Sequence, residues 1–515
     1  FRKHLGDIPF LNGGLFEVSP FYSKLPYSLK IPNTVFKAIF NDLLERFNFT
    51  VREDTPLDVE VAIDPEMLGR VFENLILQLE KDKDLRKITG SYYTPRVVVH
   101  FMCQQSLKEY LFSEWLRGFR PRPVEPGRLP FKSTSPQREL SDIMLEKQEE
   151  VHRKKIEFLY TLNPADQLSE EEINQLNAQI TINDVRVLRE LIRKAYILDP
   201  AVGSGAFLVG MLHEMISMIE LLDSREFGVE KISQPNYTYE LKIAIIENCL
   251  YGVDIQEQAV RICELRLWLS LVVDYERESG VDVPPLPNLS YKVRCGDSLI
   301  EKLFGYNVQL DQLVRTNRGS QLIDEIREDK EAYFLARDMD EKKKKELAIL
   351  YKQCELAEML INEKRCWLKD FGGVQSTIFG ETAKEQQQRE EKRKELEEYD
   401  RVLYQAENIK KKVQAMLQGK QTAFLDDIHR LRQSLGLSFI WKLDFAEVFK
   451  EKEGFDIVIA NPPYVSFGLR DVGKAKGEWA DYMRKNYPNS AEYKLSIYAI
   501  FMDKGLQLLR DKGIL

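Results

Sequence analysis

The sequence predicts an α/β fold built on a doubly wound, mainly parallel sheet. From residue 195 onward, short apolar runs typical of strands alternate with segments of helical periodicity. Four runs carry this prediction, at 196–198, 250–254, 291–293 and 455–460. Parallel neighbours need long crossover connections, usually helices, so the alternation favours a parallel sheet.

Around this core the patterns predict helices and insertions. Turn signals and helical spacing alternate near the start of the chain, and an amphipathic helix is expected over 97–117. The prolines of 118–140 indicate a loop, and Ser169, followed by three glutamates, indicates a helix start. The expected segments are 1–88 (N-terminal helical connector domain), 89–117 (helix region of the core), 118–190 (linker and helical insertion), 191–304 (first half of the core), 305–440 (charged insertion) and 441–515 (second half of the core).

The charged insertion has the spacing of two long helices. Apolar residues recur at intervals of three and four from Leu347 to Ile361, and again from Leu396 to Val413. Gly372 and Gly373 lie between the two series, which predicts an antiparallel helical hairpin. Acidic and basic residues are mixed along the second series, so its outer face is expected in solvent. A structural spacer and an arm that touches nucleic acid are both compatible with this pattern.

Composition narrows the class of protein. The chain has 74 Lys and Arg against 82 Asp and Glu, a net charge of −8, which disfavours wrapping of nucleic acid by charge alone but permits a local basic groove. With 43% hydrophobic residues and no apolar run near the length of a membrane span, a soluble protein without membrane contact is expected. Its six cysteines form no CxxC pair, so we expect no metal site and a reducing cytoplasm.

A glycine turn follows the first predicted strand. It runs from Asp199 through Ala201 and Gly203 to Gly205, before helical spacing resumes at Ala206. Glycines let the backbone bend tightly and approach a ligand closely. Leu208 occupies the place of the third glycine of the dinucleotide fingerprint, and an Asp before the turn suits an ammonium or hydroxyl better than a pyrophosphate. A tight turn with a structural role alone is the alternative.

Acidic residues also follow the second and third predicted strands. Asp254 closes the run 250–254 and can take both hydroxyls of a ribose, whereas Asp297 can accept from an adenine amino group. Either could instead cap a helix. Three acids at the carboxyl ends of successive parallel strands, Asp199 being the first, describe a nucleoside-binding edge.

The tetrapeptide Asn461-Pro462-Pro463-Tyr464 follows the fourth predicted strand. Two prolines restrict the backbone and remove N–H groups, so carbonyl oxygens are left as acceptors. The Asn461 side chain and the Pro462 carbonyl could hold the two hydrogens of an exocyclic amine, whose lone pair is otherwise delocalised. Tyr464 offers a ring for base stacking, worth about 1–3 kcal/mol. This arrangement suits methylation of an amino group without a metal or a covalent intermediate.

Together these motifs resemble the amino-methyltransferases that use S-adenosylmethionine, and among them the gamma group of adenine-N6 DNA methyltransferases. The order fits that group, because Tyr92-Tyr93-Thr94-Pro95 precedes the glycine turn and the Asn-Pro-Pro-Tyr tetrapeptide follows it. The resemblance implies a methyltransferase sheet with 89–117 as its cofactor-binding helix region. It assigns to S-adenosylmethionine the residues Tyr93, Thr94, Asp199, Ala201, Gly203, Gly205, Asp254, Ile255, Asp297 and Ser298, and to catalysis Asn461, Pro462, Pro463 and Tyr464.

The wider layout resembles type IIG restriction–modification enzymes, which join a nuclease, a methyltransferase and target recognition in one chain. The segments 8–16, 63–69 and 89–95 carry this resemblance. The chain opens on Phe1 without an initiator Met and stops near an expected strand, so we expect a fragment. The resemblance implies methylation of a flipped adenine in double-stranded DNA, with target-recognition and nuclease domains outside the chain. Asp64-Pro65-Glu66 resembles a metal-binding pair, but a helix cap explains it better.

Two positions depart from the family pattern. Val202 stands where many relatives carry Cys, and Ser496-Ile497-Tyr498 replaces a more usual Asp-Leu-Tyr. Three other functions remain open on sequence grounds. They are a phage-defence DNA methyltransferase without a nuclease, a protein-glutamine methyltransferase, which shares the Asn-Pro-Pro-Tyr tetrapeptide, and a catalytically silent DNA-binding scaffold.

Overall fold

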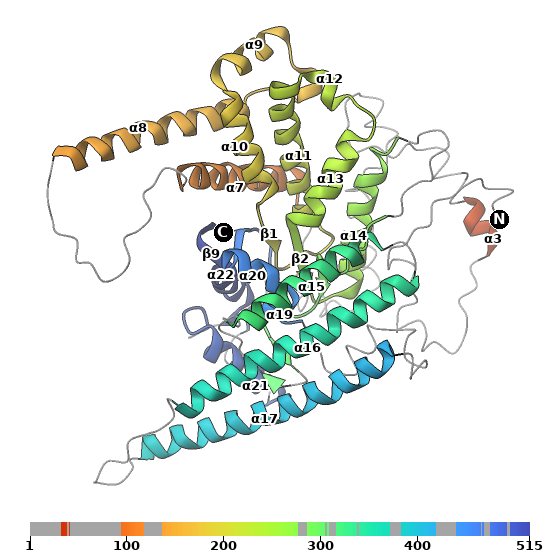
Figure 1. Cartoon of the computed structure of the whole chain (residues 1–515), viewed down its shortest axis with the longest axis vertical. Helices are drawn as coiled ribbons and strands as arrows, with labels where there is room; N and C mark the ends of the chain where they lie inside the picture. Colours follow the sequence, from red (N-terminus) through yellow and green to blue (C-terminus); the bar gives the residue numbers. More distant parts are fainter. Residues whose placement is uncertain are drawn as a thin grey trace. The chain divides into compact units, whose positions relative to one another are not determined.

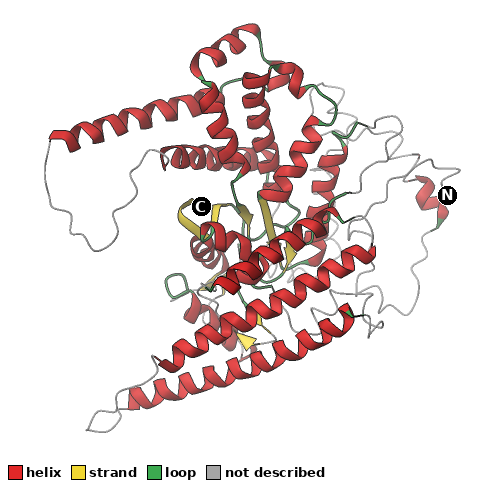
Figure 2. Ribbon diagram, viewed as in Figure 1, coloured by secondary structure: helices red, strands yellow, loops and turns green. Residues whose placement is uncertain are grey.

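A computed structural model of the chain describes residues 32–38, 41, 94–117, 136–276, 286–303, 306–307, 316–336, 339–370, 383–418, 439–464, 466–467, 474–491 and 495–515. The chain divides into two compact units. The first unit comprises 1–42, 253–264 and 280–454, and the second comprises 43–252, 265–279 and 455–515. The course of the chain is shown in Figure 1, and Figure 2 distinguishes its many helices from its few strands.

The strands confirm an α/β fold with a mainly parallel sheet. The order is β3-β2-β1-β6-β9, and β1 pairs in parallel with β2 and with β6, as β6 does with β9. The chain leaves β1 in one direction for β2 and β3 and returns to its other side at β6, which is the order of a doubly wound sheet. The strands are β1 (Ile197–Asp199), β2 (Leu250–Asp254), β3 (Val293–Cys295), β6 (Phe455–Val458) and β9 (Leu509–Ile514).

β1, β2 and β6 overlap three of the four predicted apolar runs, the third strand is shifted, and none of the four runs predicted β9. The third strand begins at Val293, so it includes only the last residue of the predicted run 291–293. Tyr291 instead packs into the core of the first unit. In the second unit, Tyr251 lies between the edges of Tyr196 and Phe455, at centroid distances of 5.8 and 5.5 Å. These rings help to fill the core beside β1, β2 and β6.

Helices surround the strands of the second unit. α11 packs against α7, α10 and α13, and α7 also packs against β6 and β9. α7 confirms the amphipathic helix predicted for 97–117, and α9 begins after a Ser169 capping box as predicted. The helices and the short strands of this unit are α7 (Arg96–Arg117), α8 (Pro136–Leu159), η3 (Ala165–Gln167), α9 (Glu170–Gln179), α10 (Ile182–Arg193), α11 (Ala206–Phe227), α12 (Val229–Ile232), α13 (Tyr237–Asn248), β7 (Ser466–Phe467), α21 (Lys474–Asn486), β8 (Leu495–Ser496) and α22 (Ile497–Leu508).

One loop prediction was too long. Residues 118–140 were expected to form a loop, yet α8 begins at Pro136. Proline suits the first turn of a helix because the N–H that it lacks has no intrahelical partner there. Pro136 therefore starts the helix, and the remainder of the predicted loop, 118–135, lies outside the described residues.

The first unit contains three long helices in the charged insertion. α16 (Met339–Asp370) and α17 (Ala383–Leu417) run antiparallel, because Glu358 pairs with Lys410 whereas Arg365, seven residues later, pairs with Asp400 at 2.7 Å. The sequence did not predict α15 (Asn317–Leu335), which packs on α16 and α20. The unit also contains α3 (Asn33–Ala38), β4 (Lys302–Leu303), β5 (Tyr306–Asn307), α19 (Trp441–Asp444) and α20 (Ala446–Lys452), and α14 (Glu257–Val272) begins in it.

Buried charges join the insertion to β3 within this unit. Lys330 of α15 donates to the Glu447 carboxylate at 2.8 Å and to the Asp444 carbonyl at 2.5 Å. Arg294 of β3 donates to the Asp444 carboxylate at 2.9 Å. All four side chains are at most 8% exposed in this network, so removal of one partner would leave an uncompensated buried charge.

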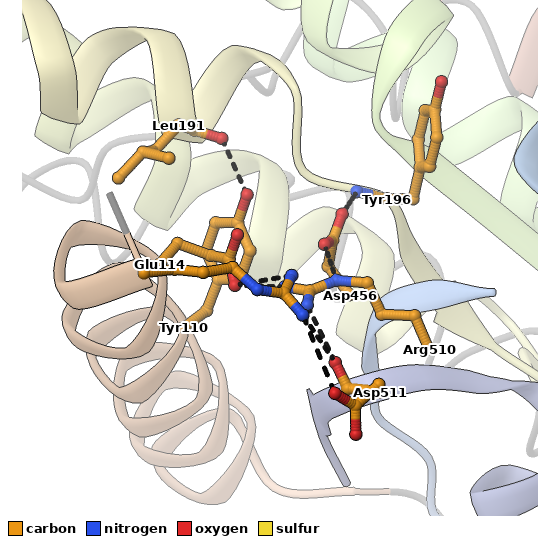
Figure 3. Close-up of polar contacts among 8 residues, drawn as sticks. Tyr110, Glu114, Leu191, Tyr196, Asp456, Arg510 and Asp511 are labelled. Carbon is orange, nitrogen blue, oxygen red and sulfur yellow. Dashed lines mark hydrogen bonds and ion pairs between the residues drawn. The ribbon is translucent and has the colours of Figure 1, made fainter. Parts of the chain in front are cut away.

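A second buried cluster joins α7, β6 and β9 (Figure 3). The Arg510 guanidinium of β9 binds the Asp456 carboxylate of β6 and, at 2.7 Å, the Glu114 carboxylate of α7. Asp456 also accepts a hydrogen bond from the Tyr196 N–H at 2.6 Å. One arginine therefore connects the strand that precedes the tetrapeptide to the helix that follows Thr94.

Candidate functional site

The glycine turn joins β1 to α11 in a backbone conformation that glycine adopts without strain. The Asp199 carboxylate is buried and accepts from the Ala201 N–H at 3.0 Å. Gly203 and Gly205 have φ angles of 51° and 85°, in the left-handed region. Gly205 is also the residue before α11, so the turn leads directly into the N-terminus of that helix. The backbone is thus bent in the manner that close approach to a ligand requires.

Gly252 of β2 lies in close contact with this turn. A Cβ added at Gly252 would lie 2.9 Å from Val202 and 3.0 Å from Leu208. Only a residue without a side chain lets β2 approach so closely. Arg266, which the sequence analysis did not single out, also donates to the Ser204 carbonyl at 3.0 Å.

Thr94 and Asn461 meet although 367 residues separate them. The Asn461 side-chain nitrogen donates to the Thr94 hydroxyl at 3.0 Å. Thr94 lies just before α7, and Asn461 follows β6, so the packing of α7 on β6 brings the two together. Both residues are half-buried. Tyr93 lies outside the described residues.

The rest of the tetrapeptide runs from the interior to the surface. Pro462 is buried, Pro463 is half-buried and Tyr464 is 60% exposed. The Tyr464 ring stacks on Tyr498 of α22, with centroids 5.4 Å apart and planes 14° from parallel. Tyr498 was noted only as part of an atypical tripeptide, since nothing in the sequence links it to Tyr464.

In the first unit, Asp254 and Asp297 bind the backbone that follows them. The Asp254 Oδ1 accepts from the Gln256 N–H at 2.8 Å, and the Asp297 Oδ1 accepts from the N–H groups of Leu299 and Ile300 at 2.9 and 3.1 Å. Both acids therefore stabilise local turns of the backbone: α14 begins only at Glu257, and the short strand β4 follows Asp297. Ile255 is 68% exposed, and Ser298 is buried with its carbonyl accepting from Trp441.

The two groups of predicted residues thus have different outcomes. The second unit brings Thr94 to Asn461 and orders the turn from Asp199 to Gly205. In the first unit, the Gly296 N–H donates to the Asp254 carbonyl at 2.8 Å, so β2 and the loop that contains Asp297 are neighbours.

Within the described ranges, no three His, Cys, Asp or Glu residues are grouped as metal ligands. Nor does any described helix have the length and apolarity to cross a membrane.

The reactivity of the Cys295 thiol reports on the negative charge of the nearby Asp254. Burial, followed by the charges of Glu257 and Asp254, raises the pKa of the Cys295 thiol to about 11. At pH 8 only about 0.1% of it is then thiolate, the reactive form. Cys295 and Cys366 are both exposed as residues, but the Cys295 sulfur itself lies against the Ile255 carbonyl at 3.7 Å. We expect iodoacetamide to modify Cys295 at least about 10-fold more slowly than Cys366. Peptide mass spectrometry over time measures both rates.

The Asp254→Asn variant completes this test. Loss of the Asp254 charge lowers the pKa of Cys295, so its modification should become faster while that of Cys366 stays constant. Equal rates for the two cysteines in the wild-type chain would contradict the expectation.

Comparison with known proteins identifies the class. Residues 248–515 match the family described as Eco57I restriction-modification methylase, and residues 172–299 match the DNA-methyltransferase domain of MmeI. The fold, the tetrapeptide and these matches define a methyltransferase of the restriction–modification type. Because the first match covers more than half of the 515 residues, the chain belongs to the Eco57I restriction-modification methylase family.

Two relatives agree with this membership. The chain is 29% identical over 538 residues to a protein of Methanocaldococcus jannaschii named "Putative type II restriction enzyme and methyltransferase RM.MjaORFECS2P". That alignment covers 99% of this chain and 38% of the relative. The chain is also 32% identical over 108 residues to the type II restriction enzyme and methyltransferase RM.Eco57I of Escherichia coli. This second alignment covers 20% of this chain and 11% of that protein. The chain thus matches 38% of the length of the first relative and 11% of the second, less than half in both cases.

Proposed function

We propose that this chain is the methyltransferase part of a type IIG restriction–modification enzyme and methylates N6 of a flipped adenine in double-stranded DNA. The observation that carries the proposal is the hydrogen bond from Asn461 to Thr94. It uses the amide nitrogen of Asn461, so the amide oxygen is turned away from Thr94 as an acceptor. An acceptor held in this way suits the hydrogen of an exocyclic amine.

The residues of the tetrapeptide divide the chemical work. The Asn461 oxygen and the Pro462 carbonyl would each accept one hydrogen of the adenine amine and draw its nitrogen toward a tetrahedral geometry. Pro463 restricts the backbone, and the exposed Tyr464 ring would stack on the base. The adenine must leave the helix, because its amine is inaccessible to an enzyme inside the duplex. Most of the catalysis would come from this positioning.

S-adenosylmethionine is the methyl donor that the family implies, and the glycine turn fits it. When bound, it supplies an electrophilic methyl group on a sulfonium. The positive φ angles of Gly203 and Gly205 and the buried Asp199 support a binding turn at the end of β1. We assign Tyr93 and Thr94 to the methionine end. The remaining cofactor residues would be Asp199, Ala201, Gly203 and Gly205 at the turn, Asp254 and Ile255 at the ribose, and Asp297 and Ser298 at the adenine.

Titration calorimetry tests the cofactor assignment. We expect the chain to bind S-adenosylmethionine and Asp254→Ala to weaken binding at least about 10-fold, because a carboxylate that takes ribose hydroxyls contributes charged hydrogen bonds. Asp324→Ala is the matched control, since Asp324 is an exposed acid of the same unit that pairs with Lys450. A folded wild-type chain that does not bind the cofactor would overturn the assignment.

The substrate is tested by product analysis. The complete protein, incubated with labelled S-adenosylmethionine and a mixed-sequence DNA library, should yield N6-methyladenine on nucleoside mass spectrometry. Methylcytosine, or methylglutamine in protein substrates, would replace the proposal by a different amino acceptor.

A further inference from the structure

Arg266 is a buried cation in contact with the glycine turn. It belongs to α14 and is only 3% exposed. Its NH1 group donates to the Ser204 carbonyl at 3.0 Å and lies 3.2 Å from the Ser204 hydroxyl oxygen. Ser204 is itself 6% exposed. The two residues lie in the second unit, so their contact is internal to that unit.

The position of Ser204 gives this contact its importance. Ser204 lies between Gly203 and Gly205, the two residues of the turn with positive φ. Glycine at these two positions allows the bend that the turn requires. Glycine also allows many other backbone conformations, so the turn needs further contacts to hold this one. A hydrogen bond from a charged donor to the intervening carbonyl opposes rotation of that peptide unit.

Burial of the Arg266 guanidinium has an unfavourable free energy of desolvation. Transfer of a charged group from water is unfavourable unless hydrogen bonds compensate for it. Among the described residues, the Arg266 Nε is a buried nitrogen without a hydrogen-bond partner. The guanidinium contacts the carbonyl and the hydroxyl of Ser204. The hydrogen bonds that compensate for its burial are therefore made to the glycine turn.

We propose that Arg266 is a positioning residue that holds the glycine turn in its cofactor-binding shape. It does so from α14, the helix that begins three residues after Asp254. Asp199 fixes the start of the turn through Ala201, and Gly252 packs against its Val202 side. The Gly205 N–H donates to the Val202 carbonyl at 2.8 Å, and Arg266 holds the same Ser204–Gly205 peptide unit from its carbonyl side. The proposal rests on the proposed function, because the ligand of the turn is S-adenosylmethionine.

The test compares cofactor affinity in buried-cation variants. Arg266→Met removes both contacts to Ser204 and should weaken S-adenosylmethionine binding by calorimetry at least about 10-fold. Lys242→Met is the matched control, because Lys242 is a buried cation of the same unit that binds the Ser270 carbonyl and Asp274, away from the turn. It should bind the cofactor like the wild-type chain even if it is less stable.

A second variant and a local measurement guard against general unfolding. Arg266→Gln keeps a donor of shorter reach, so it should fold and still lose affinity. Without cofactor, hydrogen exchange at residues 201–206 should be faster in both Arg266 variants than in Lys242→Met, relative to the rest of the unit. A folded Arg266 variant with wild-type affinity and exchange would overturn the inference. Failure of the wild-type chain to bind would instead overturn the proposed function.

Discussion

Asn461→Ala is expected to lower kcat for DNA methylation by about 10²–10³-fold, the loss typical of one preorganised hydrogen-bonding group at the reacting centre. The affinity for S-adenosylmethionine should change little, because the variant removes a contact to the substrate amine and leaves the glycine turn intact. Single-turnover methylation by the complete protein, with calorimetry on the same variant, separates the two effects. A drop in affinity with unchanged kcat would contradict the role given to Asn461.

Asn486→Ala is the matched control for this prediction. The Asn486 side-chain nitrogen also donates to an oxygen, the Tyr482 carbonyl at 2.8 Å, and it lies in the same unit. Its loss should leave kcat unchanged. Thr94→Val adds a finer comparison, because it keeps Asn461 and removes the hydroxyl that orients it. Since Thr94 is also assigned to the methionine end of the cofactor, kcat is compared at saturating S-adenosylmethionine. A smaller fall in kcat is expected for that variant, since the amide can still accept in part of its orientations.

The tetrapeptide and the turn were predictable because they are local. Asp199 and Gly203 lie close together in the sequence, after an apolar run that the structure confirms as β1. The contact between Thr94 and Asn461 was not predictable, since it depends on how α7 packs on β6. Arg266 was missed for the same reason, and so was the stacking of Tyr498 on Tyr464. A charged residue on a mainly apolar helix was the only available signal for Arg266.

Buried charges also explain what the apolar pattern missed in the fold. β9 contains Arg510, Asp511 and Lys512, so alternation of apolar and polar residues hardly marks it as a strand. Lys330 likewise interrupts the apolar face of α15. In each case an ion pair from a distant segment makes a charge acceptable in the interior. Patterns within one segment cannot reveal such partners.

Arg510→Met is therefore expected to lower the free energy of unfolding by about 3–5 kcal/mol, because it takes the Arg510 cation away from the buried Asp456 carboxylate. Glu114 loses the same cation and keeps its contact with Arg117 at 3.3 Å. Asp456 is 1% exposed and the Glu114 side chain 15%, so water can replace little of the lost interaction. The cluster also joins α7 to β6 and β9 (Figure 3), which makes its loss a loss of tertiary packing and not of one surface contact. Urea denaturation followed by circular dichroism measures the change.

Arg484→Met is the control that separates burial from charge. Arg484 pairs with Asp481 at 3.4 Å in the same unit, but the two side chains are 37% and 80% exposed. An exposed pair of this kind contributes no more than about 1 kcal/mol, since water already solvates both charges. If the two arginine variants unfolded at the same urea concentration, the buried cluster would contribute no more than a surface pair. The cluster would then connect the helix after Thr94 to the strand before Asn461 without adding to the stability of the fold.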